Sequence, residues 1–248
     1  MRCNPIITLG CMAAFIVVCQ APIKESVEKT HPNGAKEKVN YYQGQRTNIV
    51  STFYYFEDGS VRSEQHFKKG KPDSIQAIYL PGGKKYKETW YAEGNLNGDE
   101  KTWYENGQLK SQTKYENGLP VGKSITWFED GKVAAEVSYK EGKKDGEEIS
   151  YYKDGTKQSS KTYVAGEATG SEKEWYPDGK LKSEKTWAKN IMHGPYTKYY
   201  PSGKTEEEGA YKDGQYSGDR FMYNTRGKKI SWAKYENGQI VDGRSYGK

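Results

Sequence analysis

The residues of this chain that could carry acid–base or metal chemistry are three histidines and a set of regularly spaced glutamates. His31, His66 and His193 fall at unrelated places in the sequence, several strand-length segments apart, so we do not expect them to meet at one metal ion or proton. The glutamates share one column of a 24-residue pattern, which is typical of a solvated strand position: Glu64, Glu88, Glu136, Glu184 and Glu208. Catalysis needs different reactive side chains gathered at one place, whereas a repeat presents copies of the same side chains. The sequence therefore predicts a protein that is not an enzyme, with no catalytic residue, no metal and no cofactor.

Thiol chemistry is confined to the start of the chain, because the only cysteines are Cys3, Cys11 and Cys19. Residues 6–18 form an uncharged, mostly apolar run, which is of signal-peptide length and short for a membrane span. Ile16-Val17-Val18-Cys19 resembles the box in which bacterial lipoproteins are lipidated on cysteine, except that the box has a small residue where this chain has Val18. Leu9-Gly10-Cys11 has the small residue, but a shorter apolar run precedes it.

We therefore expect residues 1–19 to be a signal peptide, a lipoprotein signal or an uncleaved apolar anchor. Cys19 is preferred over Cys11 as the lipidated residue, and Pro22 after Ala21 disfavours ordinary signal-peptidase cleavage there. Each of these readings predicts export. The rest of the chain would then be a bacterial lipoprotein held at the membrane by its N-terminus, or a periplasmic or extracellular protein.

Glycine recurs with a 24-residue period, eight times without an insertion, and this spacing sets the architecture. These turn glycines are Gly59, Gly83, Gly107, Gly131, Gly155, Gly179, Gly203 and Gly227. A chain that repeats one short unit stacks each copy on its neighbours. The glycines follow strand-length segments and introduce no helix, so they do not form a phosphate-binding loop or a dinucleotide fingerprint. The spacing predicts a repeated surface rather than an active site.

One unit, residues 99–122, contains two strand-length segments separated by turn signals, with no helix-length apolar pattern. Pro177 lies two residues before Gly179, where a two-residue turn would need a backbone donor that proline lacks. We therefore predict a three-residue turn that ends in a left-handed glycine. In this register Trp103 pairs with Leu109, which predicts one apolar face and one mostly polar face.

Two further glycine columns describe the links between units. The second runs from Gly70 to Gly238 and has Asn190 as its only exception, which predicts a left-handed residue at this position in every unit. The third column has Ser74 and Asp242 instead of glycine, in the first and last full units. Terminal units depart from the pattern because they have a neighbour on one side only. The full units are therefore expected over about 51–242.

We expect three parts in the chain: the apolar segment at 1–19, a polar tether at 20–36 and a β-hairpin repeat domain at 37–248. The predicted fold is all-β. It is an elongated, twisted, antiparallel single-layer sheet of about eight stacked 24-residue hairpins.

The repeat follows the pattern Trp/Tyr-Tyr-x-Asp/Asn-Gly-Lys-Leu-Lys-Ser-Glu and then Tyr-x-x-Gly-x-x-x-Gly, with its clearest copies at 103–122 and 175–194. This pattern resembles the MORN-repeat variant over most of the chain. Proteins of this kind are often labelled YwqK-type antitoxins of toxin–antitoxin systems. The resemblance implies a long antiparallel sheet of stacked hairpins and an antitoxin-like or immunity-like role, and it supplies no catalytic residue.

Binding is the function class that remains, and a protein partner, with a toxin as one case, is the expected ligand. It would lie on a sheet face or on an edge strand. An envelope glycan is the second candidate, on an aromatic ladder that repeats every two strands, about 9.5 Å apart: Phe56, Tyr104, Phe128, Tyr152, Tyr176 and Tyr200. These rings could instead simply cover the thin sheet.

Binding to anionic lipid and a purely structural role as an envelope lipoprotein also stay open. Lipid or phosphate would touch the lysine pairs that directly follow a glycine, at 84–85, 143–144 and 228–229. Nucleic acid is not expected, because the net charge of +6 comes from 39 basic and 33 acidic residues interleaved along the repeats, without a long basic run.

The N-terminal prediction is tested by metabolic labelling of the full chain with a clickable fatty acid. We expect acyl label on the parent and on Cys11→Ala, and none on Cys19→Ala. A label that survives Cys19→Ala, or no label on the parent, would show that Cys19 is not the lipidated residue.

Overall fold

The structure is a computed structural model that describes residues 20–246. The signal or anchor predicted for residues 1–19, with Cys11 and Cys19, lies outside the described residues. The chain divides into two compact units, Met1–Asp99 and Glu100–Lys248, and each is described by itself. Over residues 20–246 every element is a strand, and no helix long and apolar enough to cross a membrane is found.

In the first unit, strands β1 to β7 pair antiparallel in sequence order, and β5 and β6 both pair with β4. The strands are β1 (Ile23–Thr30), β2 (Lys36–Gln43), β3 (Ile49–Tyr55), β4 (Val61–Lys68), β5 (Lys71–Pro72), β6 (Ser74–Tyr79), β7 (Lys85–Ala92) and β8 (Asn95–Trp103), which contains the boundary between the units.

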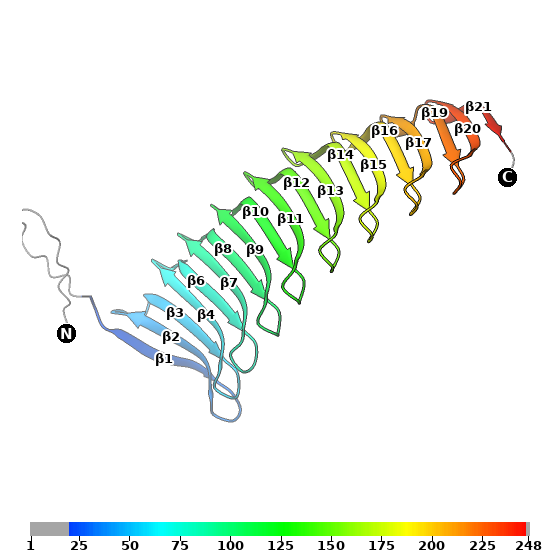
Figure 1. The fold of residues 1–248 in the computed structure, drawn as a ribbon. Coiled ribbons are helices and arrows are strands. Elements are labelled where there is room, and N and C mark those ends of the chain that lie inside the picture. The colour runs from blue at the N-terminus through cyan, green and yellow to red at the C-terminus, as the bar shows by residue number, and fades with distance from the viewer. Residues whose placement is uncertain (1–19, 247–248) are drawn as a thin grey trace, which may run out of the picture. The chain divides into compact units, whose positions relative to one another are not determined.

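In the second unit, β9 to β21 likewise pair antiparallel in sequence order, and β18 and β19 both pair with β17. The strands are β9 (Leu109–Glu116), β10 (Leu119–Trp127), β11 (Val133–Lys140), β12 (Lys143–Tyr151), β13 (Lys157–Val164), β14 (Glu167–Trp175), β15 (Leu181–Ala188), β16 (Ile191–Tyr199), β17 (Thr205–Lys212), β18 (Gln215–Tyr216), β19 (Gly218–Tyr223), β20 (Lys229–Glu236) and β21 (Gln239–Ser245). Within each unit, hairpin follows hairpin in one layer (Figure 1). The predicted all-β, single-layer antiparallel sheet of 24-residue hairpins is confirmed.

The tether predicted at 20–36 is wrong for most of its length, because β1 occupies Ile23–Thr30 and pairs with β2. Seven of the eight side chains of β1 are exposed, so backbone pairing and charge contacts hold it, with Lys29 2.7 Å from Glu37. Charged side chains are usual on a strand that would otherwise offer a bare edge.

A diverged repeat explains the extra strands. His31-Pro32-Asn33-Gly34 makes the same turn as Tyr176-Pro177-Asp178-Gly179. In both turns the N–H of the first residue donates to the carbonyl oxygen four residues later, and the N–H of the glycine donates to the carbonyl oxygen of the first residue. The step from Gly34 to Gly59 is one residue longer than the step between later turn glycines. That one-residue offset breaks the 24-residue spacing on which the prediction depended.

The first row of turns connects the two strands of each hairpin and has the predicted form. Tyr176 N–H donates to Lys180 O at 2.8 Å, and Gly179 N–H donates to Tyr176 O at 2.9 Å. Gly179 has a φ of +80°, and Trp175 pairs with Leu181 beside a register shift. This is the three-residue turn with a left-handed glycine, and proline occupies the second position of its type I turn.

The second row of turns connects one hairpin to the next. Asn190 has a φ of +67°, which confirms the left-handed position predicted from the glycine column. The residue before this position is left-handed as well: Lys189, before Asn190, has a φ of +49°, and Ala165, before Gly166, has a φ of +50°. These are therefore two-residue type I′ turns. The sequence did not predict the second left-handed residue, because lysine and alanine do not favour that conformation.

The third glycine column lies in strand bulges, where the pairing register shifts. In the second unit these glycines alternate between two conformations. Gly146 and Gly194 have φ of +107° and +111°, and a Cβ on either would come within 3.3 Å of a side-chain carbon one strand away. Gly122 and Gly170 have φ of +68° and +71°, and a Cβ there would meet nothing within 4 Å.

The predicted division into one apolar and one polar face holds only in part. Val137 lies opposite Glu148 in the ladder, Glu148 lies opposite Lys161, and Lys161 lies opposite Glu172, so these side chains share one face. Among the described residues, the buried hydrophobic side chains are Val39, Tyr42, Ala77 and Ala168. Hydrophobic burial is thin, and polar contacts between neighbouring strands take a large part in holding the sheet.

The turn geometry is tested by Gly118→Val, with Glu116→Val as its matched control on the same turn. Gly118 has a φ of +83° and open space around it, so valine there adds backbone strain of about 1–3 kcal/mol without a clash. Glu116 is exposed on a strand, where valine should change the free energy of unfolding by no more than about 0.5 kcal/mol. Urea unfolding measures both, and equal losses would contradict a left-handed Gly118.

Candidate functional site

The predicted aromatic ladder lies along the first row of turns, with each ring just before a three-residue turn and half-buried. Every tyrosine of the ladder donates its hydroxyl to a main-chain carbonyl of the next repeat. Tyr176 bonds Tyr199 O at 2.7 Å, and Tyr104, Tyr152 and Tyr200 make the same bond to Trp127, Trp175 and Tyr223 at 2.7–2.8 Å. Phe56 and Phe128 occupy the same position without a hydroxyl.

These rings therefore tie one repeat to the next. His31 does the same in the first unit, where its Nε2 lies 3.0 Å from Tyr55 O. The sequence did not place His31 in this column, because its turn is offset by one residue.

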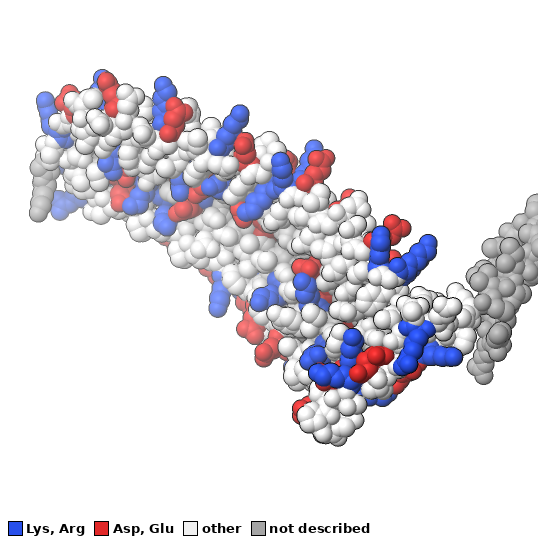
Figure 2. Space-filling model, turned by 180° about the vertical axis from the view of Figure 1, so that it is seen from behind, with Lys and Arg blue, Asp and Glu red and all other residues white. Residues whose placement is uncertain are grey.

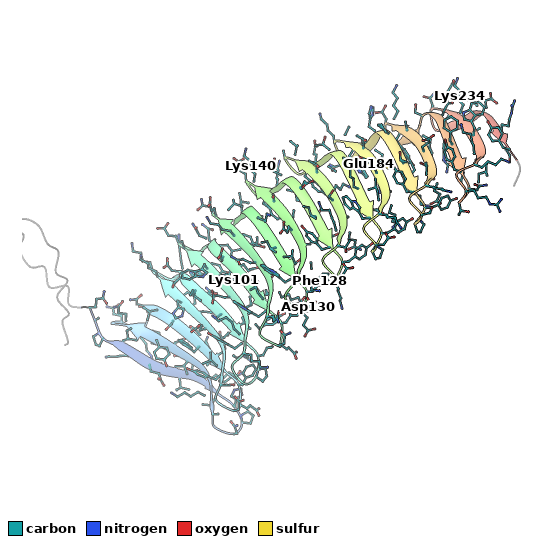
Figure 3. All side chains as sticks on the ribbon, viewed as in Figure 1. Lys101, Phe128, Asp130, Lys140, Glu184 and Lys234 are labelled. Atoms are coloured by element: carbon teal, nitrogen blue, oxygen red, sulfur yellow. The ribbon has the colours of Figure 1, made fainter. Side chains whose placement is uncertain are left out.

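The turns themselves make further ties along this row. Asn106 Nδ2 donates to Glu129 O at 2.9 Å, and Lys180 Nζ donates to Pro201 O at 3.1 Å. The side chains of Gln108 and Thr156 lie over the turn glycines of the following repeats, Gly131 and Gly179. In Figure 3, Phe128 and Asp130 lie at this row, whereas Lys140 lies at the opposite ends of the strands.

The glutamate column is engaged by neighbouring strands. Glu136 pairs with Lys123 at 2.9 Å, and Glu184 pairs with Lys173 at 3.2 Å. Glu64 accepts a hydrogen bond from Tyr79 at 2.7 Å, and burial together with this bond raises the pKa of Tyr79 to about 12. These carboxylates stabilise cross-strand contacts and do not pair with one another here.

The histidines that the sequence singled out have separate surroundings. His66 Nε2 lies 3.8 Å from Glu64, and its ring meets Phe53 edge-on. His193, in the second unit, accepts a long hydrogen bond of 3.5 Å from Asp213 N–H. Over the described residues, no group of three His, Cys, Asp or Glu side chains could hold a metal ion.

The sequence missed a cluster of charges on one face of β13 to β15. Glu172 lies 2.9 Å from both Lys161 and Lys185, and only 13% of its side chain is exposed. Burial acts to raise the pKa of Glu172, but hydrogen bonds from Lys185 and Lys161 outweigh it and lower that pKa. Lys161 also lies 3.8 Å from the centre of the Trp187 ring. The unit at 99–122 has Glu100 at the position of Glu172 but Thr113 at the position of both lysines, so its sequence did not indicate an ion-pair cluster.

A shallow groove of about 360 Å³ opens on the second unit near the first row of turns. It is lined by Ser150, Tyr152, Gln158, Ser159, Glu174, Trp175 and Lys182. Tyr152 is the one member of the predicted ladder among these residues.

The second row of turns carries exposed apolar side chains. Leu119, Val164 and Ile191 are 50%, 55% and 49% exposed, and each lies next to a type I′ turn of the second unit. Ala188, directly opposite Ile191, is exposed too. We call Leu119, Val164, Ala188 and Ile191 the apolar turn row.

Basic and acidic side chains are mixed on the face shown in Figure 2. Many charged side chains of the described residues form pairs, such as Lys198 with Glu206 at 2.8 Å. This distribution does not resemble the one-signed groove of a nucleic-acid-binding protein.

Comparison with protein families finds one match. The family described as MORN repeat variant matches residues 51–69, 96–117, 120–141, 144–165, 168–189 and 192–213, which together are just over half of the chain. A comparison with curated proteins finds no match.

Solved structures give distant likenesses. The Tc holotoxin pore of Photorhabdus luminescens and a complex of TcdB2–TccC3 with Cdc42 are each 11% identical to this chain, with TM-scores of 0.23 and 0.22. Each alignment covers 90% of this chain but only 15% of the other. A porin-like protein from Bacteroides uniformis is 10% identical, with a TM-score of 0.21 and coverage of 90% of this chain and 92% of that one.

The charge cluster is tested by Glu172→Gln, with Glu184→Gln as a control on the more exposed, opposite face. At pH 7 we expect Glu172→Gln to lose about 1–3 kcal/mol of unfolding free energy and the control less than about 1 kcal/mol. The pKa of Glu172 is lowered on folding, so its contribution is present above its usual value of 4.5 and is lost as pH falls through the lower folded value. The gap between the variant and the parent should therefore shrink below pH 4.5. A gap that is constant with pH would contradict this role.

Proposed function

The chain belongs to the MORN repeat variant family, and from this premise we propose that it is a non-catalytic repeat scaffold that holds a protein partner at the bacterial cell envelope. An antitoxin-like or immunity-like role, in which the partner is a toxin, is the form of this function that the sequence pattern favours. A repeat sheet suits such a role because stacked copies present an extended surface.

The observation that carries the proposal is the apolar turn row. Val164 and Ile191 are each about half exposed on adjacent turns, and the alanines at 165 and 188 beside them are exposed too. Exposed apolar clusters rimmed by polar residues mark protein-interaction sites more often than scattered apolar residues do. The neighbouring Lys189 and Glu167 supply such a polar rim.

The ladder and the lysine pairs support glycan or lipid binding less well. The tyrosine hydroxyls of the ladder are already bonded to carbonyls of the next repeat, as Tyr176 is to Tyr199. Of the lysine pairs, Lys144 is 2.6 Å from Glu148, and Lys229 lies 3.6 Å from the centre of the Phe221 ring.

The envelope location rests on the N-terminal sequence. The apolar run at 6–18 and Cys19 after it have the order of a lipoprotein signal. A scaffold held there by its N-terminus would present its partner at the membrane, without a catalytic step of its own.

The test is affinity purification of the full tagged chain from its native envelope, with quantification of co-purified proteins. We expect one protein in near-stoichiometric amount, and we expect it to fall at least tenfold with Val164→Gln plus Ile191→Gln. Ser202→Gln plus Thr225→Gln, exposed on the first row of turns, is the matched control and should retain the partner.

Two outcomes would overturn the proposal. Repeated absence of any stoichiometric protein would favour a purely structural envelope lipoprotein. Loss of the partner with the control pair but not with the Val164 and Ile191 pair would move the interaction away from the apolar turn row.

A further inference from the structure

Two tyrosines face each other across the turn that joins β17 to β18. Tyr211 lies directly opposite Tyr216 in the ladder, and their ring centres are 4.4 Å apart with 30° between the ring planes. Tyr216 is also 5.1 Å from Tyr235 on β20, and Tyr211 is 5.8 Å from Tyr196 on β16. The four half-buried rings follow one another across these strands, and the contact between Tyr211 and Tyr216 is the shortest of the three.

This tyrosine pair departs from the repeat. The column of Tyr211 is aromatic in every hairpin, but the residue five positions later is not aromatic in the other hairpins. At those places the chain has Pro72, Leu96, Pro120, Lys144, Ala168, Met192 and Ile240. Among these hairpins, only the one at β17 and β18 therefore sets two phenol rings opposite each other.

A carboxylate lies at the hydroxyl of one of the two rings. Tyr216 donates its hydroxyl to Glu207 Oε1 at 3.1 Å, and only 11% of the Glu207 side chain is exposed. The same oxygen accepts a hydrogen bond from Arg220 Nε at 2.6 Å. Glu207 departs from the repeat as well, because its column otherwise holds Ser63, Lys87, Ser111, Ala135, Ser159, Ser183 and Ser231.

The contact with Glu207 gives the Tyr216 hydroxyl a place to send its proton. Burial raises the pKa of Tyr216 above its usual value, so the side chain is a neutral phenol at pH 7. A phenol that loses one electron becomes strongly acidic, and the electron leaves more readily when a positioned base takes the proton. Tyr216 is therefore suited to one-electron oxidation, with Tyr211 beside it as the ring with which a radical would react.

We propose that Tyr211 and Tyr216 form a site of oxidative cross-linking, at which a one-electron oxidant joins the two rings into a dityrosine. The oxidant takes one electron from each ring, while the phenol proton of Tyr216 passes to Glu207 and that of Tyr211 to water. A carbon next to the hydroxyl in each ring then forms the new C–C bond. The hydrogens on these two carbons move to the phenol oxygens, so the pair loses two electrons and two protons in all.

The cross-link would close a hairpin whose backbone pairing is short. β18 consists of Gln215 and Tyr216 alone, and Ser217 separates it from β19. A covalent bond from Tyr211 to Tyr216 would hold β18 against β17 across this interruption. The site lies in the sheet itself and does not depend on the protein partner proposed above.

The test is photo-oxidation of the dilute full chain by a ruthenium tris-bipyridine complex with persulfate, which is a small one-electron oxidant. We expect dityrosine fluorescence on a species that has the mass of one chain less two hydrogen atoms. Trypsin cleaves after Lys212, so the two tyrosines fall in separate peptides, 205–212 and 213–220. These two peptides should be recovered as a linked pair.

Tyr211→Phe and Tyr216→Phe should each lower the total dityrosine fluorescence at least tenfold. Phenylalanine fills the column of Tyr211 at Phe67, so the first variant should fold. Tyr163→Phe is the matched control, because Tyr163 shares that column but lies opposite Ala168. The control should keep the fluorescence of the parent.

Glu207→Gln tests the proton acceptor, and Glu206→Gln beside it is the control, which removes an ion pair with Lys198 instead. We expect the rate of cross-linking to fall at least threefold with Glu207→Gln and to stay near that of the parent with Glu206→Gln. Equal rates in the two variants would overturn the role of Glu207. Circular dichroism of each variant shows whether it is folded.

Three results would overturn the cross-linking site itself. They are no dityrosine in the oxidised parent, dityrosine only between chains, and a main product that links peptide 213–220 to the peptide of Tyr235. Equal loss of fluorescence with Tyr211→Phe and Tyr163→Phe would also contradict it. None of these outcomes bears on the apolar turn row, so the two proposals fail independently.

Discussion

Hydrogen bonds between successive repeats are the interaction on which this structure depends. No described element covers the sheet within either unit, so a repeat has only its neighbours along the chain to hold it. At one row of turns the Tyr176 hydroxyl bonds Tyr199 O, and at the other Gly214 N–H bonds Met192 O. Stability in such a sheet is close to a sum of nearest-neighbour terms. A repeat can therefore vary its exposed side chains only if the groups that make these hydrogen bonds are kept.

These hydrogen bonds divide the surface into side chains that hold the sheet together and side chains that are available for binding. The ladder tyrosines and the glutamate column are the most regular features of the chain, and both are engaged within the sheet. The apolar turn row and the pair of Tyr211 and Tyr216 are irregular by comparison, because each depends on residues that differ between copies. Regularity here marks the scaffold, and departures from it mark the places where recognition or modification can occur.

Much of the fold could be predicted from the sequence because some backbone conformations favour only a few residue types. Pro177 before Gly179 predicted the three-residue turn, and Asn190 in a glycine column predicted a left-handed residue. The repeat at His31 was missed because a single extra residue shifted Gly34. The charge cluster around Glu172 and the groove were missed for another reason. They join side chains from three or four strands, and the distances between them follow from the register of neighbouring hairpins, which one unit alone does not contain.

The alternation of the bulge glycines changes what counts as the repeating unit. Gly122, Gly170 and Gly218 share one backbone conformation, with φ of +68° to +75°, whereas Gly146 and Gly194 share another. The sequence therefore repeats with every hairpin, but the backbone of the second unit repeats only with every second hairpin. Lengthening or shortening this sheet without disturbing its geometry means adding or removing hairpins in pairs. A single inserted hairpin would place two bulges of the same kind side by side.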